Sequence, residues 1–227
     1  MGMEGKLRQV SGTELNTYRK NPEELYSDMM RRANPPEVQK FIAKMMELQT
    51  SAVVKRIEER ASAGLAPHPA DSEAYREQMN ALITENREAI TGWESMHIGR
   101  SKNGQELSLH KSWHCLHYIL TGKSWEPVDS TLGKAILGGE EIPDRQGVMG
   151  YGPVRFLAAE EVREIAEALE AFPIDERLAA FDPEEAQKAK VYVPGHEADE
   201  LKGYFDVLRD FYGEAAKKKC AMLLWVV

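Results

Sequence analysis

The sequence is poor in cysteine. It contains only two, Cys115 and Cys220, and they do not form a CxxC pair. A zinc knuckle or a disulfide framework needs several cysteines at close and regular spacings, so the sequence predicts neither. Each cysteine lies in an apolar stretch, and we expect both to behave as small hydrophobic residues of the core.

The sequence also lacks a long hydrophobic run. Its longest, Cys220 to Val227, is far shorter than the roughly 20 apolar residues that span a bilayer. The opening residues, Met1 to Lys6, contain no apolar core of a secretory signal, and Lys6 stands where a myristoylation motif requires serine or threonine. We expect a cytoplasmic protein without a membrane partner.

Basic residues are outnumbered by acidic ones. Lys and Arg number 29 against 37 Asp and Glu, which gives a net charge of -8. Proteins that bind the phosphate backbone of nucleic acids usually present a basic face, so no nucleic-acid partner is expected. The short basic runs at Arg31-Arg32 and at 217–219 lie near expected helix C-termini, where cations interact favourably with the helix dipole. We interpret both runs as solvated helix ends.

The pattern that is present is mostly amphipathic helix, with a few strands. Strand-like segments are Met3–Val10, Tyr151–Leu157, Val191–Val193 and Cys220–Val227. They do not alternate with helices as βαβ units do, so we predict an α+β fold: one helix-rich domain over 1–227 around a small, mainly antiparallel sheet. The last strand is apolar throughout, which predicts a central position beside the first strand. Val191–Val193 is predicted as an edge strand.

Several residues mark expected helix boundaries. Ser11 and Thr13 are the expected capping residues of the first helix, and Pro22 occupies the first turn of the second. Gly122 ends the helix that contains Trp113, and Asp182 precedes a short helix. Two further helices are predicted at 158–171 and 201–218 because both segments combine good helix formers with an apolar stripe.

Two long amphipathic helices, 36–63 and 71–93, are predicted to fold back on each other as an antiparallel hairpin at about 35–95. Gly64 and the segment 66–69, which contains two prolines, indicate the turn. Apolar residues form two adjacent stripes on the first helix, more than one neighbour covers. Packing against the rest of the chain is the favoured interpretation. The alternative is a surface for a protein partner or a second copy of the chain, which periodicity alone does not distinguish.

Three histidines, His110, His114 and His117, fall at i, i+4 and i+7 of one expected helix, within about 60° of one another. Such a strip can donate imidazoles to a metal. A metalloprotease helix, however, requires glutamate after its first histidine, and Lys111 stands there. The strip also borders an apolar stripe that contains Trp113, so a structural role is favoured and no metal site is predicted.

Glycine-rich turns occur at Gly138-Gly139 and at 150–153, where the sequence is Gly-Tyr-Gly-Pro. Neither matches a P-loop or a dinucleotide fingerprint, so we interpret both as tight turns and predict no cofactor. Tyr151 lies within the second turn, and Arg155 follows it in a half-buried strand. Arg155 either anchors a carboxylate or phosphate ligand or pairs with an acid of the chain itself: Glu140, Glu141 or Asp144.

Several of these segments occur together, in order, in one group of proteins. They are Met1-Gly2-Met3-x-Gly5, Trp113-His114-x-Leu116-His117-Tyr118-x-Leu120-Thr121-Gly122, Leu137-Gly138-Gly139, and Gly150-Tyr151-Gly152-Pro153-x-Arg155-Phe156-Leu157 with Glu160-Glu161-Val162. The chain thereby resembles the YfbM-like family of bacterial proteins, a domain of unknown function, over roughly 1–30 and 106–227.

The resemblance implies an α+β fold and a bacterial, intracellular setting, and it implies no activity. Two features depart from the family. His110 stands where the family usually has an acid, so a three-histidine site is not implied. The hairpin at about 35–95 is longer than in compact members, so its role is not implied either.

We therefore expect a non-catalytic binding or interaction module of the immunity or accessory type, with 36–93 as a surface for a protein partner or a second copy. The alternative is an enzyme or small-ligand binder with a single cleft. The candidate ligand-binding residues are Trp113, His114, His117, Tyr151 and Arg155, the last four lining that cleft. No catalytic residue is predicted. If the histidines are structural, we expect His117 to be buried and His114 to be the more exposed.

Overall fold

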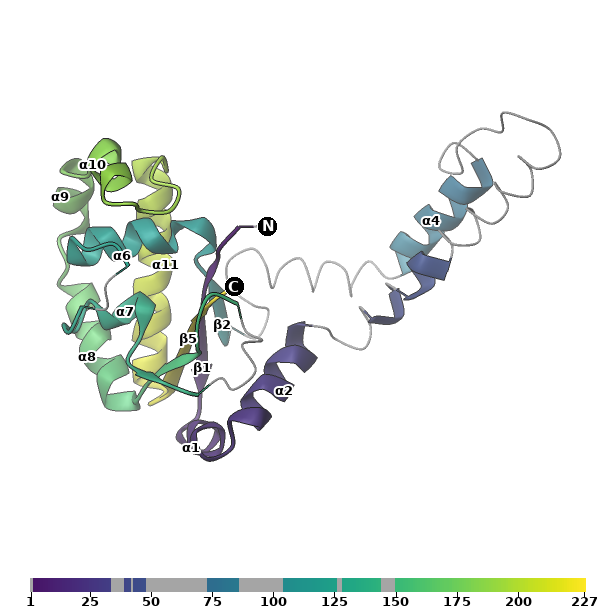
Figure 1. Cartoon of the computed structure of the whole chain (residues 1–227), viewed down its shortest axis with the longest axis horizontal. Coiled ribbons are helices and arrows are strands. Elements are labelled where there is room, and N and C mark those ends of the chain that lie inside the picture. Colours follow the sequence, from purple (N-terminus) through teal and green to yellow (C-terminus); the bar gives the residue numbers. More distant parts are fainter. Residues whose placement is uncertain are drawn as a thin grey trace. The chain divides into compact units, whose positions relative to one another are not determined.

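In the computed structural model, the described residues are 2–33, 39–41, 43–47, 73–85, 104–125, 128–143 and 150–227. The chain divides into two compact units, drawn in Figure 1. One comprises residues 1–26 and 95–227, and the other comprises 27–94, which includes most of the segment predicted as a hairpin.

The first unit contains all five strands of the described chain. They are β1 (Gly5–Val10), β2 (Glu106–Ser108), β3 (Glu140–Glu141), β4 (Arg155–Leu157) and β5 (Ala221–Val226). The helices that lie wholly within this unit are α1 (Gly12–Lys20), η2 (His110–Ser112), α6 (Trp113–Thr121), α7 (Lys134–Leu137), α8 (Ala159–Glu170), α9 (Ile174–Ala179), α10 (Pro183–Lys188) and α11 (Ala198–Lys217). The predicted α+β fold is confirmed.

The strands form one antiparallel sheet in the order β2-β1-β5-β4-β3. The first and last strands pair along their whole length, from Gly5 opposite Val226 to Val10 opposite Ala221. The predicted pairing of the two chain ends and the central position of the last strand are both confirmed. They follow from the composition of β5, because a strand that is apolar on both faces needs neighbours on both sides.

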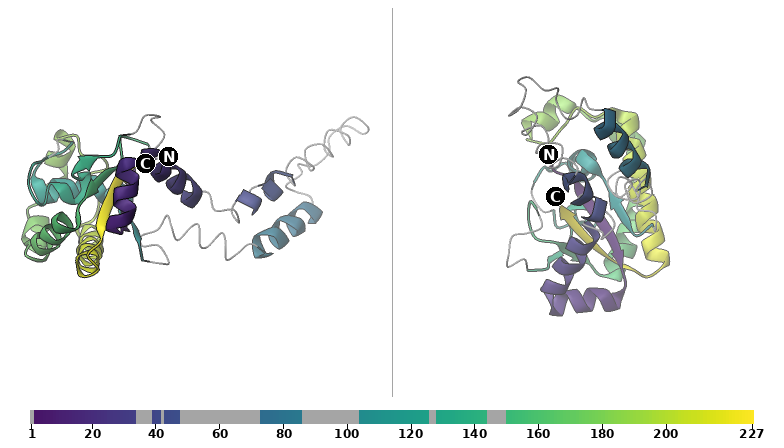
Figure 2. Two further views of the ribbon diagram at one scale, coloured as in Figure 1. Left: turned by 90° about the horizontal axis from the view of Figure 1, so that it is seen from below. Right: turned by 90° about the vertical axis from the view of Figure 1, so that its right-hand side faces the viewer.

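The two faces of the sheet are covered by different helices (Figure 2). One face carries Leu7, Met222 and Leu157, which belong to the main core together with buried residues of α6, α8 and α11. The side-chain amide of Gln9 on this face donates to the backbone carbonyl of Phe211 in α11. On the opposite face, Arg19 of α1 lies over the ring of Phe156, 4.8 Å from its centre.

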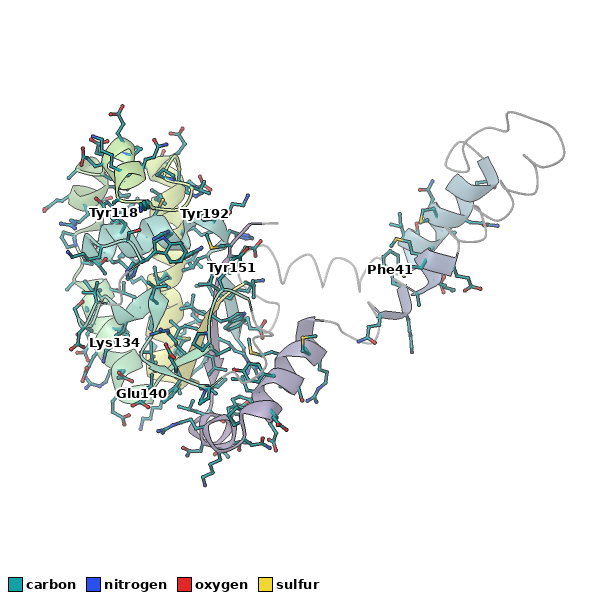
Figure 3. The ribbon with its side chains drawn as sticks, viewed as in Figure 1. Phe41, Tyr118, Lys134, Glu140, Tyr151 and Tyr192 are labelled. Carbon is teal, nitrogen blue, oxygen red and sulfur yellow. The ribbon has the colours of Figure 1, made fainter. Side chains whose placement is uncertain are left out.

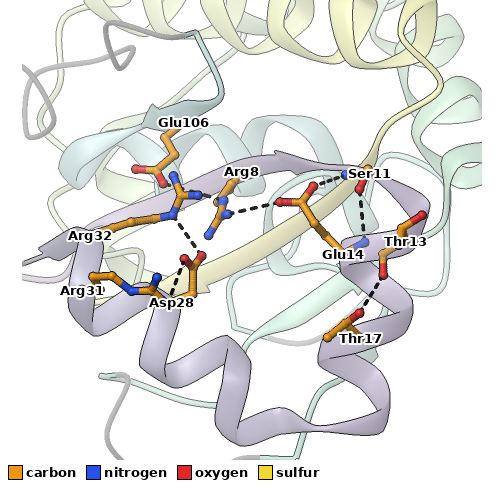
Figure 4. Close-up of polar contacts among 9 residues, drawn as sticks. All are labelled: Arg8, Ser11, Thr13, Glu14, Thr17, Asp28, Arg31, Arg32 and Glu106. Carbon is orange, nitrogen blue, oxygen red and sulfur yellow. Dashed lines mark hydrogen bonds and ion pairs between the residues drawn. The ribbon is translucent and has the colours of Figure 1, made fainter.

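Arg8 of β1 is buried on this second face and links the sheet to α1 (Figure 4). Its guanidinium lies 3.8 Å from the carboxylates of Glu14 in α1 and of Glu106 in β2. Glu14 also completes the N-terminal cap of α1: its carboxylate accepts the N–H of Ser11, while the Ser11 hydroxyl accepts the N–H of Glu14. Of the two predicted capping residues, Ser11 is therefore the N-cap, whereas Thr13 lies inside the helix. Glu14, the partner of Ser11 in this capping box, also pairs with the buried arginine.

The other predicted helix boundaries are also confirmed. Pro22 begins α2 (Pro22–Ala33), and Gly122 ends α6 in the left-handed conformation with φ of 70°. Asp182 caps α10 by accepting the N–H of Glu184. None of the helices in the described part of the chain has the length and apolarity required to cross a bilayer.

The segment Val191–Val193 is not a strand, so that prediction was wrong. It forms a loop in which Lys190 and Val193 have positive φ angles of 62° and 51°. Val191 is buried in the core, which accounts for its apolar character. The side chains of His114 and Cys115 in α6 form hydrogen bonds to the backbone of this loop.

The second unit contains the remainder of α2, helical residues at 39–41 and 43–47, and α4 (Glu73–Glu85). Phe41, labelled in Figure 3, is half-buried, and Leu82 of α4 is buried. Lys44 forms an ion pair of 3.6 Å with Glu85, a contact that two helices folded back on each other would give. The predicted turn at 64–69 and the far ends of both helices lie outside the described residues.

Candidate functional site

A pocket of about 180 Å³ lies at the end of the central strand β5. Its lining residues are Trp125, Ile136, Leu137, Tyr151, Gly152, Pro153, Arg155, Leu224, Trp225 and Val226. Of these described lining residues, Arg155 alone is charged. Pockets for cofactors and drug-sized ligands usually enclose about 300 Å³ or more, so this one suits a single side chain or a very small molecule.

Tyr151 is held at the edge of this pocket by the turn that precedes β4. Its backbone N–H donates to the carbonyl of Val226 at 3.0 Å, which joins the turn to the end of β5. Gly150 permits this approach: it has φ of 110°, and a Cβ there would lie 2.5 Å from the same carbonyl oxygen. The Tyr151 side chain is 64% exposed, which is unusual for a large aromatic residue, and it is labelled in Figure 3.

Arg155 begins β4, directly opposite Glu141 in β3, and its guanidinium donates to the Glu141 carboxylate. The aliphatic stem of Arg155 packs against Gly138, where a Cβ would lie 2.6 Å from that of Arg155. Gly138 has φ of 80°, so glycine serves both the backbone conformation and the close contact. Among the acids considered for Arg155, Glu141 is thus the partner, and Asp144 lies outside the described residues.

The neighbouring acid, Glu140, is held on the opposite face of the same short strand. Glu140 pairs with Phe156 in the sheet, and its carboxylate lies 3.7 Å from the guanidinium of Arg19. Adjacent strand residues point to opposite faces, so Glu141 interacts on the side of Arg155 and Glu140 on the side of α1. The two glutamates therefore suit a comparison of variants, because Glu141 pairs with a lining residue of the pocket and Glu140 does not.

Trp125 connects the pocket to the helix that carries the histidines. Its ring lies edge-on to His114, with centres 4.5 Å apart, and edge-on to Trp113, at 5.4 Å. Trp113 and His114 are themselves stacked at 4.6 Å. Trp113 and His114 are fully buried, whereas Trp125 is 45% exposed, so Trp125 alone of these three presents a surface to the pocket.

Both ring nitrogens of His114 are occupied by protein groups. Nδ1 accepts the backbone N–H of Tyr192 at 2.8 Å, and Nε2 lies 3.1 Å from the hydroxyl of Ser124. Because Nδ1 accepts, the neutral ring carries its proton on Nε2, which donates to Ser124. Burial lowers the pKa of His114 to about 4. The ring is therefore neutral at physiological pH, with no nitrogen available for a metal ion.

His110 and His117 do not form a metal site together with His114. His110 lies in η2, before α6 begins, and has φ of 46°, so the three histidines do not share one regular helix. His117 is fully buried, as is His114; the prediction that His114 would be the more exposed was wrong. Among the described residues, no three His, Cys, Asp or Glu side chains are grouped as metal ligands.

The cysteine beside His114 has a structural contact too. The thiol of Cys115 is buried and donates to the carbonyl of Val193, in the loop that His114 binds. Burial, with a smaller contribution from Glu200, raises the pKa of Cys115 to about 12. Burial also raises the pKa of Cys220. Both thiols therefore stay protonated, which makes them poor nucleophiles.

The structure thus separates the five candidate residues. Tyr151 and Arg155 line the pocket, whereas Trp113, His114 and His117 belong to the buried interior and are not among its lining residues. The alternative interpretation placed His114, His117, Tyr151 and Arg155 in one cleft; of these four, only Tyr151 and Arg155 line the described pocket.

The other lining residues of the pocket were not predicted as site residues from the sequence. Trp225 lies in a strand whose apolar run does not show which residues face outward. Trp125 can stack on a ligand, but packing in the core is the more frequent role of a tryptophan, and it was not chosen as a site residue. A signal was nevertheless present, because tryptophan is rare in this sequence: there are only four. Of these, Trp125 lies shortly after the histidine helix, and Trp225 lies within the last strand.

Comparison with known proteins identifies the chain at the level of its family. The model of a domain of unknown function, DUF1877, matches residues 1–225, so the chain belongs to this family. Among solved structures, the chain is similar to YfbM from Escherichia coli, a protein of unknown function, with 13% identity, 99% of each chain covered and a TM-score of 0.52. At that identity the likeness shows the fold alone. No match was found among curated proteins.

Proposed function

We propose that this member of the DUF1877 family is a non-catalytic binding module whose pocket receives one anchor side chain of a protein partner. The observation that carries the proposal is the composition of the pocket: its lining combines exposed Tyr151 and Trp125 with Arg155 and several apolar residues. Tyrosine, tryptophan and arginine are the residues that contribute most to protein–protein binding energy. The volume of about 180 Å³ suits a single inserted side chain.

The chemistry of the lining favours binding over catalysis. Among the described lining residues there is no histidine, cysteine, serine or carboxylate to act as a general base or nucleophile. The histidines that suggested an enzyme are buried, and the ring of His114 is committed to Tyr192 and Ser124. The alternative of a small-ligand binder retains only Tyr151 and Arg155 of its four predicted residues.

The setting and the second surface are part of the same proposal. We place the protein in the bacterial cytoplasm, as an immunity-type or accessory-type module. Residues 36–93, predicted as a helical hairpin, would give a further surface for a partner or a second copy. The exposed side chains Met46 and Ile83 support this, because each is a large apolar residue in this unit that is more than 40% exposed.

A one-residue mimic of an anchor tests the pocket directly. N-acetyl-L-phenylalanine amide carries a phenyl ring between two peptide groups and no charge. We expect it to change the tryptophan fluorescence with a dissociation constant on the order of millimolar. Tyr151→Ala should weaken binding about fivefold or more, because it removes one aromatic wall. Val207→Ala is the control: Val207 is also an exposed apolar residue, but it lies in α11 and is not among the lining residues. Equal affinities of the wild type and both variants would refute the proposal.

A further inference from the structure

The arginine and its glutamate partner differ in their relation to the pocket. Arg155 lines the pocket and is the only charged residue among the described lining, whereas Glu141 is not part of the lining. A group that enters the pocket therefore meets Arg155, whereas the carboxylate that neutralises this arginine lies outside the lining. Guanidinium groups bind carboxylates through strong charge-assisted hydrogen bonds.

Another carboxylate can replace Glu141 as the partner of Arg155. Glu141 belongs to a strand of two residues at the edge of the sheet, and its side chain is 54% exposed. Exposed ion pairs contribute little stability, because water solvates the separated partners well. Arg155, in contrast, is 26% exposed and packs its stem against Gly138. Glu141 can thus turn into solvent while Arg155 stays in place.

The other lining residues favour an aromatic group beside the carboxylate. Trp125, Tyr151 and Trp225 present aromatic surfaces beside several apolar lining residues. Resting on the proposed function, we infer that the anchor is an aromatic side chain with a carboxylate next to it, so that the partner segment is acidic. The ring enters between the aromatic walls, and the carboxylate replaces Glu141 on Arg155. Glu141 then acts as an internal competitor that occupies the arginine when no partner is bound.

Two probes of nearly the same shape, one charged and one neutral, test this inference. N-acetyl-L-phenylalanine, ionised at neutral pH, has the ring and a carboxylate, and in its amide an uncharged carboxamide replaces that carboxylate. We expect the acid to bind the wild type about tenfold more tightly than the amide, since it gains a charge-assisted hydrogen bond. Arg155→Met should abolish the difference between the probes. The melting temperature of each variant shows whether it is folded.

The exchange with Glu141 has its own variant and its own control. Glu141→Gln removes the competing charge at an exposed position, and it should strengthen binding of the acid by about threefold to tenfold without affecting the amide. Glu140→Gln makes the same change one residue away, on the face of Arg19, and should leave both affinities as in the wild type. This comparison remains decisive even where Arg155→Met is unfolded.

The outcomes separate this inference from the proposed function. If both probes bind the wild type equally and Tyr151→Ala abolishes binding of both, the recognition of a carboxylate is contradicted, whereas the aromatic anchor of the proposed function is retained. Binding of neither probe would overturn both. An acid that binds more tightly but is unaffected by Glu141→Gln would overturn the exchange.

Discussion

His114 accepts the backbone N–H of Tyr192 through Nδ1 at 2.8 Å, a bond between residues 78 positions apart in the chain. It ties a buried helix to the loop that precedes α11. Cys115, the next residue of the helix, binds the same loop at Val193. The most histidine-rich part of the chain therefore stabilises the fold. The candidate binding surface is the pocket that Trp125, Tyr151 and Arg155 help to line.

Replacement of His114 should lower stability substantially. His114→Leu leaves the N–H of Tyr192 without its acceptor and removes the ring that stacks on Trp113. An orphaned amide together with lost packing is expected to reduce the free energy of unfolding by roughly 2–4 kcal/mol. Urea denaturation measures this directly. A reduction below about 0.5 kcal/mol would contradict the structural role.

His110→Asn is the matched control for that variant. His110 is also a histidine of this segment but is only partly buried, and asparagine tolerates its positive φ of 46°. We expect a change below about 1 kcal/mol. If the two variants are equally destabilised, the bond to Tyr192 is not the reason.

The same histidine predicts how stability depends on pH. Burial lowers the pKa of His114 to about 4, and the unfolded chain binds the proton first as the pH falls, near the ordinary value of 6.5. The contribution of His114 is therefore complete above about pH 6.5, decreases as the pH falls towards about 4, and is lost below that. Denaturation of the wild type across this interval should show the decrease. His114→Leu should show a smaller one, and identical pH profiles would count against the assignment.

Gly5→Ala tests the packing of β1 against the start of α6. A Cβ at Gly5 would lie 2.8 Å from Cγ of Trp113, whose side chain is fully buried. Overpacking of this kind typically costs about 1–3 kcal/mol, which thermal unfolding would detect. Gly12→Ala provides the contrast, because a Cβ there meets no atom within 4 Å and alanine favours the helix. It should be neutral or stabilising, and a destabilised Gly12→Ala beside a neutral Gly5→Ala would contradict the packing described.

Self-association through the second unit is tested by Phe41→Glu. Phe41 is a half-buried aromatic residue of the predicted hairpin, and a charge there should weaken a contact with a second copy. Light scattering should give a larger mass for the wild type than for the variant. Asn80→Glu adds the same charge at an exposed polar position and should behave as the wild type. A monomer in every case, with unchanged stability, would exclude the contact between copies.

The sequence predicted the framework of the first unit because local and pairing signals agreed there. Ser11, Pro22, Gly122 and Asp182 mark helix ends by their own backbone chemistry, and each does so in the structure. The apolar run at 221–226 required neighbours on both sides, which predicted its central place in the sheet.

Composition and periodicity do not reveal contacts between segments that are distant in the sequence. Val191–Val193 has the composition of a strand, but its backbone is held by side chains of His114 and Cys115, which periodicity does not reveal. The pocket combines residues from 125 to 226 that meet only once β4 and β5 have paired. Tyr151 and Arg155 were predicted as candidates from the glycine turn and the strand charge; Trp225 was not, since an apolar strand does not show which residue is left at a pocket.

The most direct test of the account is where an anchor mimic binds. Each tryptophan gives one indole N–H signal in a ¹⁵N–¹H NMR spectrum, and Trp→Phe variants assign the signals. On addition of N-acetyl-L-phenylalanine amide, the account predicts that the signals of Trp125 and Trp225 shift most, while that of buried Trp113 changes little. Shifts confined to Trp113, or no shift of any tryptophan at saturating probe, would contradict the claim that this pocket is the binding site.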